Sequence, residues 1–311
     1  MTEKLCIYHG NCADGFGAAY AVWKWDPSVT FHAGVYQDPP PDVTGKDVIL
    51  VDFSYRRAVL EEMAKTARTI TILDHHKSAA EDLDAFTMKS NRLDEMAMSF
   101  DEFQGWCEFN GIYPIRALFD IDRSGAMIAW QHFHRVSPPR LFEHIQDRDL
   151  WRFALPGTRE IQAMVFSHPY DFAVWDELVA RCDDTAGWGA MIAEGKAIER
   201  KHFKDIDELL KVVTTRLVIG GHDVPVANLP YTMTSDAGHQ LAQGEPFAAC
   251  YWDTPAGRVF SLRSSDDGLD VAEIAKQFGG GGHKHAAGFR LGYDEIDRIT
   301  TGQSCFRPRS T

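Results

Sequence analysis

Short aliphatic runs alternate with amphipathic segments through the first third of the chain. The aliphatic runs read KLCIYH, VTFHAG, DVILVDF and RTITILDHH, and the segments GFGAAYAVWKW and RRAVLEEMAKTA between them have helical patterning. Strands that are aliphatic almost throughout and are separated by helices are typical of a parallel sheet covered on both faces. This part of the sequence therefore predicts a doubly wound α/β domain.

The length of 311 residues exceeds the usual size of one compact domain, so two domains are expected. The charged, helix-favouring segment GWGAMIAEGKAIERKHFKDIDELLK separates two differently patterned regions. After it come a hairpin signal, VVTTRLVIGGHDVPVANL, and the strand-like runs PFAACYW and RVFSLRS. We predict a first domain over residues 1–185, a helical linker over 186–212, and a smaller α/β domain with a mixed sheet over 213–311.

The composition limits the partners of the chain. A formal net charge of -13 argues against a protein that holds long nucleic acid on a basic surface. No apolar run reaches the roughly 18 residues that span a bilayer, and the N-terminus lacks the pattern of a signal peptide. The six cysteines form no C-x-x-C pair. We expect a cytoplasmic protein without a membrane partner, as a monomer or a homodimer.

Acidic and histidine side chains fall where the strands of the first domain are predicted to end. The carboxyl ends of the strands form the ligand crevice of an open α/β sheet, so these side chains are expected to converge. Crowded carboxylates repel one another unless cations neutralise them, and mixed oxygen and imidazole ligands suit manganese, magnesium or another divalent ion. The residues are His9, Asp14, Asp52, Asp74, His75, His76, Asp147 and Asp149.

His75 and His76 follow directly after a predicted buried strand. Successive side chains of an extended segment point to opposite sides, so these two histidines are expected to have different roles in the site. One would bind metal while the other faces the substrate.

The motifs HGNCADG, VDF, LDHH, RSGA and QDRD, followed by GGGGHKHAAG, occur in this order along the chain. In this respect the sequence resembles the DHH phosphoesterase superfamily, in the branch that carries a C-terminal DHH-associated domain. That branch includes nanoRNases, adenosine-bisphosphate phosphatases, cyclic-dinucleotide phosphodiesterases and single-strand exonucleases. The resemblance implies a metal-binding catalytic domain, a substrate-binding domain and two Mn²⁺ ions.

The resemblance also implies a role for each matched residue. His9 would bind the first metal, Asp14 the second, and Asp52 would bridge both. His75 and Asp147 would complete the second site, with Asp149 as the rival of Asp147, and His76 would contact the scissile phosphate. His76, Asp52 and His75 are thus the expected catalytic residues.

The chain departs from the family pattern in the first motif. Members usually carry another aspartate two residues before the one matched by Asp14, and here that residue is Cys12, with Asn11 beside it. Cys12 or Asn11 would then be a weaker ligand of the first metal. Alternatively, Cys12 is a small buried residue in a tight loop, as cysteines without disulfides commonly are.

The glycine run near the C-terminus is a candidate phosphate cradle. Glycines let backbone N–H groups approach an anion and adopt positive φ, so that several donors converge. Arg263 matches the arginine by which the family grips a nucleotide phosphate. A flexible loop after a helix is the alternative. The candidate substrate-binding residues are Arg263, Gly280, Gly281, Gly282 and His283.

Together these features predict a phosphoric ester hydrolase that cleaves phosphodiester bonds of short oligonucleotides or cyclic nucleotides. Two metal ions would activate the attacking water. A phosphomonoesterase acting on nucleotide bisphosphates is the alternative enzyme, and a nucleotide-binding regulatory protein with a decayed metal site is the alternative outside enzymes.

Overall fold

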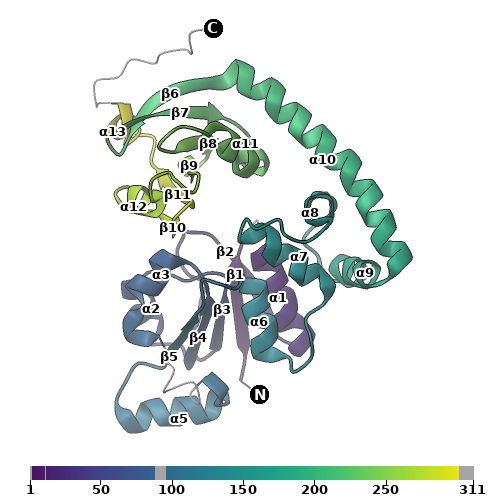
Figure 1. Ribbon diagram of the computed structural model, residues 1–311. Helices are drawn as coiled ribbons and strands as arrows, with labels where there is room; N and C mark the ends of the chain where they lie inside the picture. Colours follow the sequence, from purple (N-terminus) through teal and green to yellow (C-terminus); the bar gives the residue numbers. More distant parts are fainter. Residues whose placement is uncertain (1, 11, 88–95, 301–311) are drawn as a thin grey trace. The chain divides into compact units, whose positions relative to one another are not determined.

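The computed structural model describes residues 2–10, 12–87 and 96–300 (Figure 1). The chain divides into two compact units, residues 1–199 and residues 200–311. Each unit has its own sheet and its own core, and each is described by itself.

A five-stranded parallel sheet forms the centre of the first unit. Its strands lie in the order β2-β1-β3-β4-β5, and every neighbouring pair is parallel. The order reverses between β1 and β3, and such a switch point is where open α/β sheets bind ligands. The bounds are β1 Lys4–His9, β2 Thr30–Gly34, β3 Asp47–Val51, β4 Thr69–Asp74 and β5 Ile115–Phe119.

Helices cover both faces of this sheet and bury two separate apolar cores (Figure 1). In β3, Ile49 and Val51 pack on the side of α1 and α6, whereas Val48 and Leu50 pack on the side of α2. The alternation follows from the two-residue repeat of a strand. The helices are α1 Ala13–Trp25, α2 Arg57–Met63, α3 Lys77–Asp82, η1 Asp84–Phe86, α5 Phe100–Asn110, α6 Gly125–Phe133, α7 Arg140–Asp149, α8 Thr158–Phe166 and α9 Phe172–Asp183.

A single long helix, α10 Thr185–Val213, occupies the segment predicted as the linker. Within the first unit, Met191 is fully buried in the core shared with α1 and α6. Gly195 lies so close to α8 that an added Cβ would meet the backbone oxygen of Glu160 at 1.9 Å. Within the second unit, Ile206 is buried against α11 and β8. The helix is therefore part of both cores.

The second unit contains a six-stranded mixed sheet in the order β10-β11-β9-β8-β7-β6. The β7–β8 pair is parallel, and the other pairs are antiparallel. Strand β8 places Ala249 in the core under α12, and Ala248 and Cys250 in the core under α11. The bounds are β6 Thr214–Ile219, β7 His222–Asn228, η3 Tyr231–Met233, α11 Thr234–Leu241, β8 Ala248–Thr254, β9 Gly257–Arg263, α12 Val271–Lys276, β10 Gly281–His283, β11 Ala286–Leu291 and α13 Asp297–Thr300.

The hairpin between β6 and β7 turns on Gly220 and Gly221, which have φ values of 57° and 84°. Two consecutive positive φ angles are the requirement of a tight two-residue turn, and glycine meets it without strain. The predicted hairpin is present in the structure.

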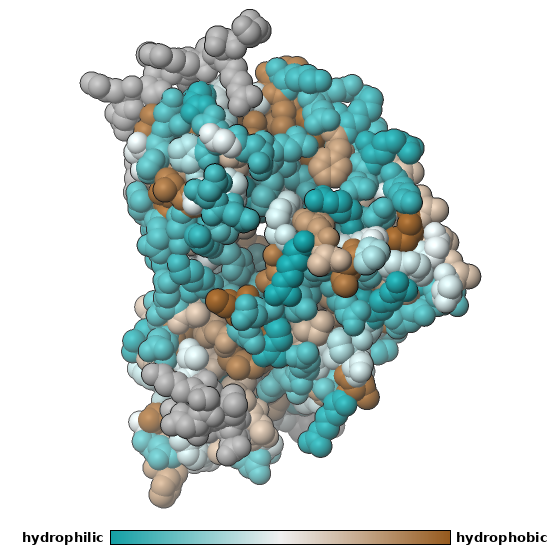
Figure 2. Space-filling model, viewed as in Figure 1, coloured by the Kyte–Doolittle hydropathy of each residue, from teal (hydrophilic) through white to brown (hydrophobic). Residues whose placement is uncertain are grey.

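The predicted fold class is confirmed, since a doubly wound parallel α/β unit and a second unit with a mixed sheet are both present. The domain bounds stay a prediction. Among the described residues, no helix combines the length and apolar character required to cross a bilayer. Hydrophilic residues predominate on the face drawn in Figure 2, with apolar residues scattered among them.

Two glycines of α10 offer a matched test of the α8–α10 contact. Gly195→Ala places a methyl group against the Glu160 backbone, whereas Gly189→Ala meets nothing within 4 Å. We expect Gly195→Ala to lower the free energy of unfolding by about 1–3 kcal/mol. Gly189→Ala should raise it by up to about 1 kcal/mol through helix propensity. Urea denaturation measures both, and equal effects would contradict the close contact.

Candidate metal centre

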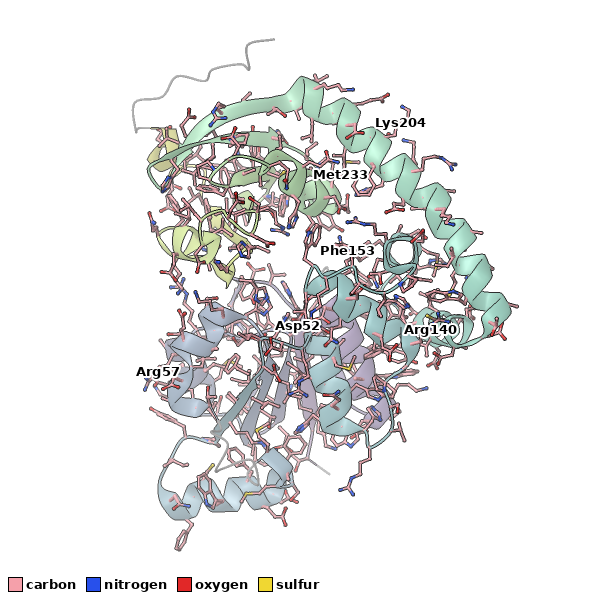
Figure 3. All side chains as sticks on the ribbon, in the orientation of Figure 1. Asp52, Arg57, Arg140, Phe153, Lys204 and Met233 are labelled. Carbon is pink, nitrogen blue, oxygen red and sulfur yellow. The ribbon has the colours of Figure 1, made fainter. Side chains whose placement is uncertain are left out.

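The candidate site lies at the carboxyl ends of β1, β3 and β4. His9 is the last residue of β1, Asp52 follows β3 directly, and Asp74 is the last residue of β4. Figure 3 labels Asp52 at this end of the sheet. The convergence expected from the sequence is therefore present, at the switch point of the strand order.

Asp52 lies at the centre of the cluster and is 1% exposed. Its φ of 52° is unusual for a residue other than glycine, and its N–H donates to the Leu73 carbonyl at 2.9 Å. His75 Nε2 lies 3.0 Å from Oδ1 and His9 Nδ1 lies 3.4 Å from Oδ2, yet neither carboxylate oxygen has a hydrogen bond in the described part of the chain. A buried carboxylate of this kind needs positive charge beside it.

Two glycines make room for this arrangement. A Cβ on Gly125, the first residue of α6, would lie 2.4 Å from Asp52 Cβ, and a Cβ on Gly15 would lie 2.2 Å from the His9 backbone oxygen. Any side chain at either position would displace a member of the cluster. The sequence did not lead us to expect a role for either glycine, although Gly15 belongs to the HGNCADG motif and Gly125 to the RSGA motif, so both positions carried a signal.

Asp14 lies in the first turn of α1 and accepts two backbone hydrogen bonds from the start of α6. Gly125 N–H donates to Oδ2 at 2.6 Å, and Ala126 N–H donates to Oδ1 at 3.0 Å. His75 Nε2 lies 3.6 Å from the same Oδ2. Because a helix N-terminus favours negative charge, α6 fixes this carboxylate beside Asp52.

The His75 and His76 rings do not lie on opposite sides, since their centroids are 4.9 Å apart and both approach Asp52 Oδ1, but the two rings have different nearest partners. The His75 ring faces Asp14, Asp52 and Asp149. The His76 ring is held by Asp74, whose Oδ1 lies 2.7 Å from Nδ1. An ionised carboxylate can only accept, so Nδ1 carries the proton, and in the neutral ring Nε2 carries the lone pair.

The structure does not bring Asp147 to this cluster, and this part of the expected ligand set is corrected. Its carboxylate accepts hydrogen bonds from Ala154 N at 2.8 Å, Leu155 N at 3.0 Å and Thr158 Oγ1 at 2.6 Å. Thr158 Oγ1 also lies 2.8 Å from His144 Nδ1. Asp147 thus fixes the turn after α7 and has no oxygen directed at the other described ligands.

Asp149, the last residue of α7, occupies the position that Asp147 was expected to fill. Its Oδ2 lies 3.5 Å from His75 Nε2, and its side chain is 24% exposed. Residues two apart on a helix differ in direction by roughly 200°, so only one of these two aspartates can face the site.

Among the described residues of the first unit, three groups of three residues have the spacing of metal ligands, and in each group the ligand atoms lie within 4.8 Å of one another. His9, Cys12 and Asp52 form one group, and Asp14, His75 and Asp149 form another. Asp52, Asp74 and His76 form the third, in which Asp74 already accepts the His76 Nδ1 proton. Asn11 lies outside the described residues. The buried Asp52 carboxylate, with both its oxygens lacking hydrogen bonds in the described chain, fits a cation beside it. The ligand roles themselves stay predictions.

The carboxylates and histidines of the cluster perturb one another. Burial and the charges of Asp52 and Asp149 raise the pKa of Asp14 well above its ordinary value. Burial and Asp52 also raise the pKa of Asp149. Burial favours neutral Asp52, but His75 and His9 outweigh it and lower the pKa of this carboxyl. Burial lowers the pKa values of His9 and His75, but Asp52 reverses the effect and raises both.

In the second unit, Arg263 ends β9 and is held by several partners. Its guanidinium donates to Ser261 Oγ at 3.0 Å, to the Leu262 carbonyl at 2.8 Å and to Ser235 Oγ at 2.7 Å. These bonds set the plane of the guanidinium. Phosphate binding by this residue stays a prediction.

The glycine run has a packing role in the second unit. A Cβ on Gly280 would lie 2.0 Å from the Gly288 oxygen, and a Cβ on Gly282 would lie 2.6 Å from the Ala286 oxygen. Gly281, Gly282 and His283 form β10, which pairs with β11. Close approach to the backbone of β11 therefore accounts for Gly280 and Gly282, and the role of the glycine run in a phosphate cradle stays a prediction.

An aromatic side chain that was not expected from the sequence lies next to the cluster. Tyr36 contacts His9 edge to face, with ring centroids 5.3 Å apart, and contacts His76 at 6.0 Å. It is 41% exposed. It follows β2 in a loop without charged motif residues, so the sequence carried no signal for it.

Comparisons with known proteins agree with this architecture. Residues 242–301 match the family model of the DHHA1 domain. The chain is 30% identical over 310 residues to the uncharacterized protein R106 of Acanthamoeba polyphaga mimivirus; the match covers 91% of this chain and 66% of that relative's length.

Among solved structures, the DHH domain of PF0399, described as a member of the s1p family of ribosomal proteins, superposes with a TM-score of 0.57 at 12% identity. This match covers 96% of the chain and 84% of that structure. RecJ from Thermus thermophilus, solved in complex with Mn²⁺, gives a TM-score of 0.46 at 13% identity, covering 95% and 50%. The matched DHHA1 domain and the fold shared with the DHH domain of PF0399 agree with the resemblance to the DHH phosphoesterase superfamily.

The two aspartates of α7 give a matched test of the revised ligand set. We expect Asp149→Asn to weaken Mn²⁺ binding by about tenfold or more, because it removes a charged oxygen donor. Asp147→Asn should instead lower the free energy of unfolding by about 1–3 kcal/mol, because it disturbs three hydrogen bonds of a buried carboxylate. Titration calorimetry and urea denaturation measure the two effects. Exchanged outcomes would restore Asp147 as the ligand.

Metal binding should release protons. Asp14, Asp149, His9 and His75 have raised pKa values in the metal-free protein, and a cation displaces the protons that they hold. Metal affinity is therefore expected to fall as the pH drops through these raised pKa values. Calorimetric titration of Mn²⁺ in two buffers with different ionisation enthalpies measures the release, and a heat independent of the buffer would refute it.

Proposed function

We propose that this protein is a metal-dependent phosphoric ester hydrolase that cleaves phosphodiester bonds of small nucleotides, either short oligonucleotides or cyclic nucleotides. The observation that carries the proposal is the buried Asp52 carboxylate, which belongs to one group of metal-ligand residues and faces His75 of another. The DHHA1 domain and the resemblance to the DHH phosphoesterase superfamily support the same reaction class.

His9, Asp52, Asp14, His75 and Asp149 would hold two divalent ions, with Mn²⁺ as the first candidate and Mg²⁺ as an alternative. When bound, such ions neutralise phosphate oxygens and lower the pKa of a coordinated water. Asp52 presents one oxygen toward His9 and the other toward His75, so it is suited to bridge them. Its buried, fixed position would keep the separation of the two ions constant.

His76 would act on the substrate. Asp74 is fully buried and accepts the His76 Nδ1 proton, and it also accepts the backbone N–H groups of His75 and His76 at 2.7 and 3.3 Å. This pairing fixes the ring and its tautomer. When the ring is charged, Nε2 also carries a proton and would donate it in a hydrogen bond to the scissile phosphate or transfer it to the leaving oxygen.

Small substrates agree with the charge of the chain. A surface that tracks a long nucleic acid strand requires many basic residues, and the formal net charge here is -13. Arg263, whose guanidinium plane is set by its hydrogen bonds, would bind a further phosphate of the substrate. A cytoplasmic location and a monomeric or dimeric state remain predictions.

Hydrolysis assays with Mn²⁺ on a dinucleotide, a cyclic dinucleotide and adenosine bisphosphate would test the proposal. Cleavage of the diesters supports it. Release of phosphate from the bisphosphate alone would favour a phosphomonoesterase. Nucleotide binding without turnover would favour a regulatory protein whose metal site has decayed.

Asp52→Asn separates the chemistry of the site from the stability of the fold. Asparagine tolerates the positive φ of this position, so the fold should persist, while turnover falls by about a hundredfold or more. The control Asp101→Asn, at a side chain 86% exposed, should leave turnover unchanged. Initial rates with Mn²⁺ and circular dichroism make the comparison, and full activity of Asp52→Asn would exclude the bridging role.

A further inference from the structure

The two groups of ligand residues differ in chemical character. His9, Cys12 and Asp52 offer nitrogen, sulfur and oxygen, whereas Asp14, His75 and Asp149 offer one nitrogen and two carboxylate oxygens. Thiolate sulfur favours zinc, iron and other soft or borderline ions, and carboxylate oxygen suits manganese and magnesium. Two adjacent sites of one centre thus have unlike preferences.

Cys12 differs from the other described cysteines. Cys6, Cys107, Cys182 and Cys250 are at most 2% exposed and lie in apolar surroundings. Cys12 precedes α1 in an extended conformation, and its carbonyl accepts the Phe16 N–H at 3.0 Å. Its side chain makes no capping hydrogen bond. The backbone bond fixes the residue beside His9, and packing in an apolar core does not explain a thiol there.

Asp52 supplies the second, independent observation. It is 1% exposed, both of its oxygens lack hydrogen bonds in the described part of the chain, and it belongs to the His9–Cys12 group. His9 Nδ1 lies 3.4 Å from Oδ2, and His75 Nε2 lies 3.0 Å from Oδ1. The carboxylate therefore presents a different oxygen to each group.

We propose that the centre is heterodinuclear and that Cys12 is a metal ligand. The His9–Cys12–Asp52 group binds a thiophilic divalent ion, Zn²⁺, Fe²⁺ or Co²⁺, through the Cys12 thiolate. The Asp14–His75–Asp149 group, with the other Asp52 oxygen, binds a harder ion such as Mn²⁺. Formation of the metal–sulfur bond releases the thiol proton to solvent. This inference rests on the metal centre of the proposed function and adds the identity of its ions.

Cobalt reports the bond directly, because a Co²⁺–thiolate bond has an intense near-ultraviolet charge-transfer absorption that oxygen and nitrogen ligands do not produce. Titration of the metal-free protein with Co²⁺ should develop this band with one equivalent per chain. Cys12→Ser should remove it, while Cys107→Ala, the matched control at a core cysteine, should retain it. A wild-type protein without the band, or a Cys12→Ser variant with it, overturns the proposal.

Metal content gives a second readout that does not depend on activity. Wild-type protein reconstituted with equimolar Zn²⁺ and Mn²⁺ should hold one of each per chain, as measured by elemental mass spectrometry after removal of unbound metal. Cys12→Asp exchanges sulfur for oxygen and should reduce the preference of the first site for Zn²⁺ by at least about tenfold. Two identical ions in the wild type, or unchanged selectivity in Cys12→Asp, contradicts the heterodinuclear centre.

The two proposals fail in different ways. Turnover of nucleotide substrates without a cobalt–thiolate band leaves the hydrolase in place and removes Cys12 as a ligand. A band that depends on Cys12, without turnover of any nucleotide, retains the mixed metal site and refutes the hydrolase.

Discussion

The electrostatic cost of burying Asp52 governs the local structure of the first unit. A carboxylate that is 1% exposed, with no hydrogen bond to its oxygens from the described residues, is unstable unless positive charge lies beside it. Holding the Asp52 carboxylate in this position costs further free energy in the surrounding backbone. The backbone adopts a positive φ, and the absence of a side chain at Gly125 admits the Asp52 Cβ. Such concentrated strain and buried charge is typical of a site whose stability depends on a ligand.

Much of this arrangement could be predicted from the sequence. The periodicity of each strand is a local pattern, and the parallel sheet then determines which strand ends meet. A buried strand that ends in Asp74, His75 and His76 predicts both a site at the sheet edge and different directions for the two histidines. The structure has the site at the sheet edge, but the two histidine rings are neighbours with centroids 4.9 Å apart and differ in their nearest partners rather than in the side on which they lie. Neither prediction requires knowledge of distant contacts, since parallel strands bring their carboxyl ends to one edge of the sheet.

The choice between Asp147 and Asp149 required the helical repeat, which the motif alone does not show. Leu141 and Ile145 are buried on one face of α7, and Asp149, four positions further, continues that face. Asp147 lies on another face and binds the turn after the helix. The four-residue spacing was present in the sequence, but His144 and Asp147 are also buried on α7, so burial alone does not decide between the two aspartates.

The glycine run was harder to interpret, because anion binding and close strand packing both require glycine at these positions. A phosphate cradle and a close strand pair both exclude Cβ atoms, and the sequence does not distinguish them. The structure provides the contact that Gly280 and Gly282 would lose, the approach of β10 to β11. Packing alone is therefore a sufficient cause for these two residues, and anion binding requires separate evidence.

The charge balance of the proposed centre bears on how an acidic chain would bind an anionic substrate. Two divalent ions carry four positive charges, and the carboxylates of Asp14, Asp52 and Asp149 with a Cys12 thiolate carry four negative charges. The loaded ligand set would then be neutral, so it would not attract phosphate through net charge. Attraction would come from coordination positions left open on the ions. Binding of this kind is short-ranged, and it favours a small phosphate ester over a long strand that the remaining acidic surface would repel.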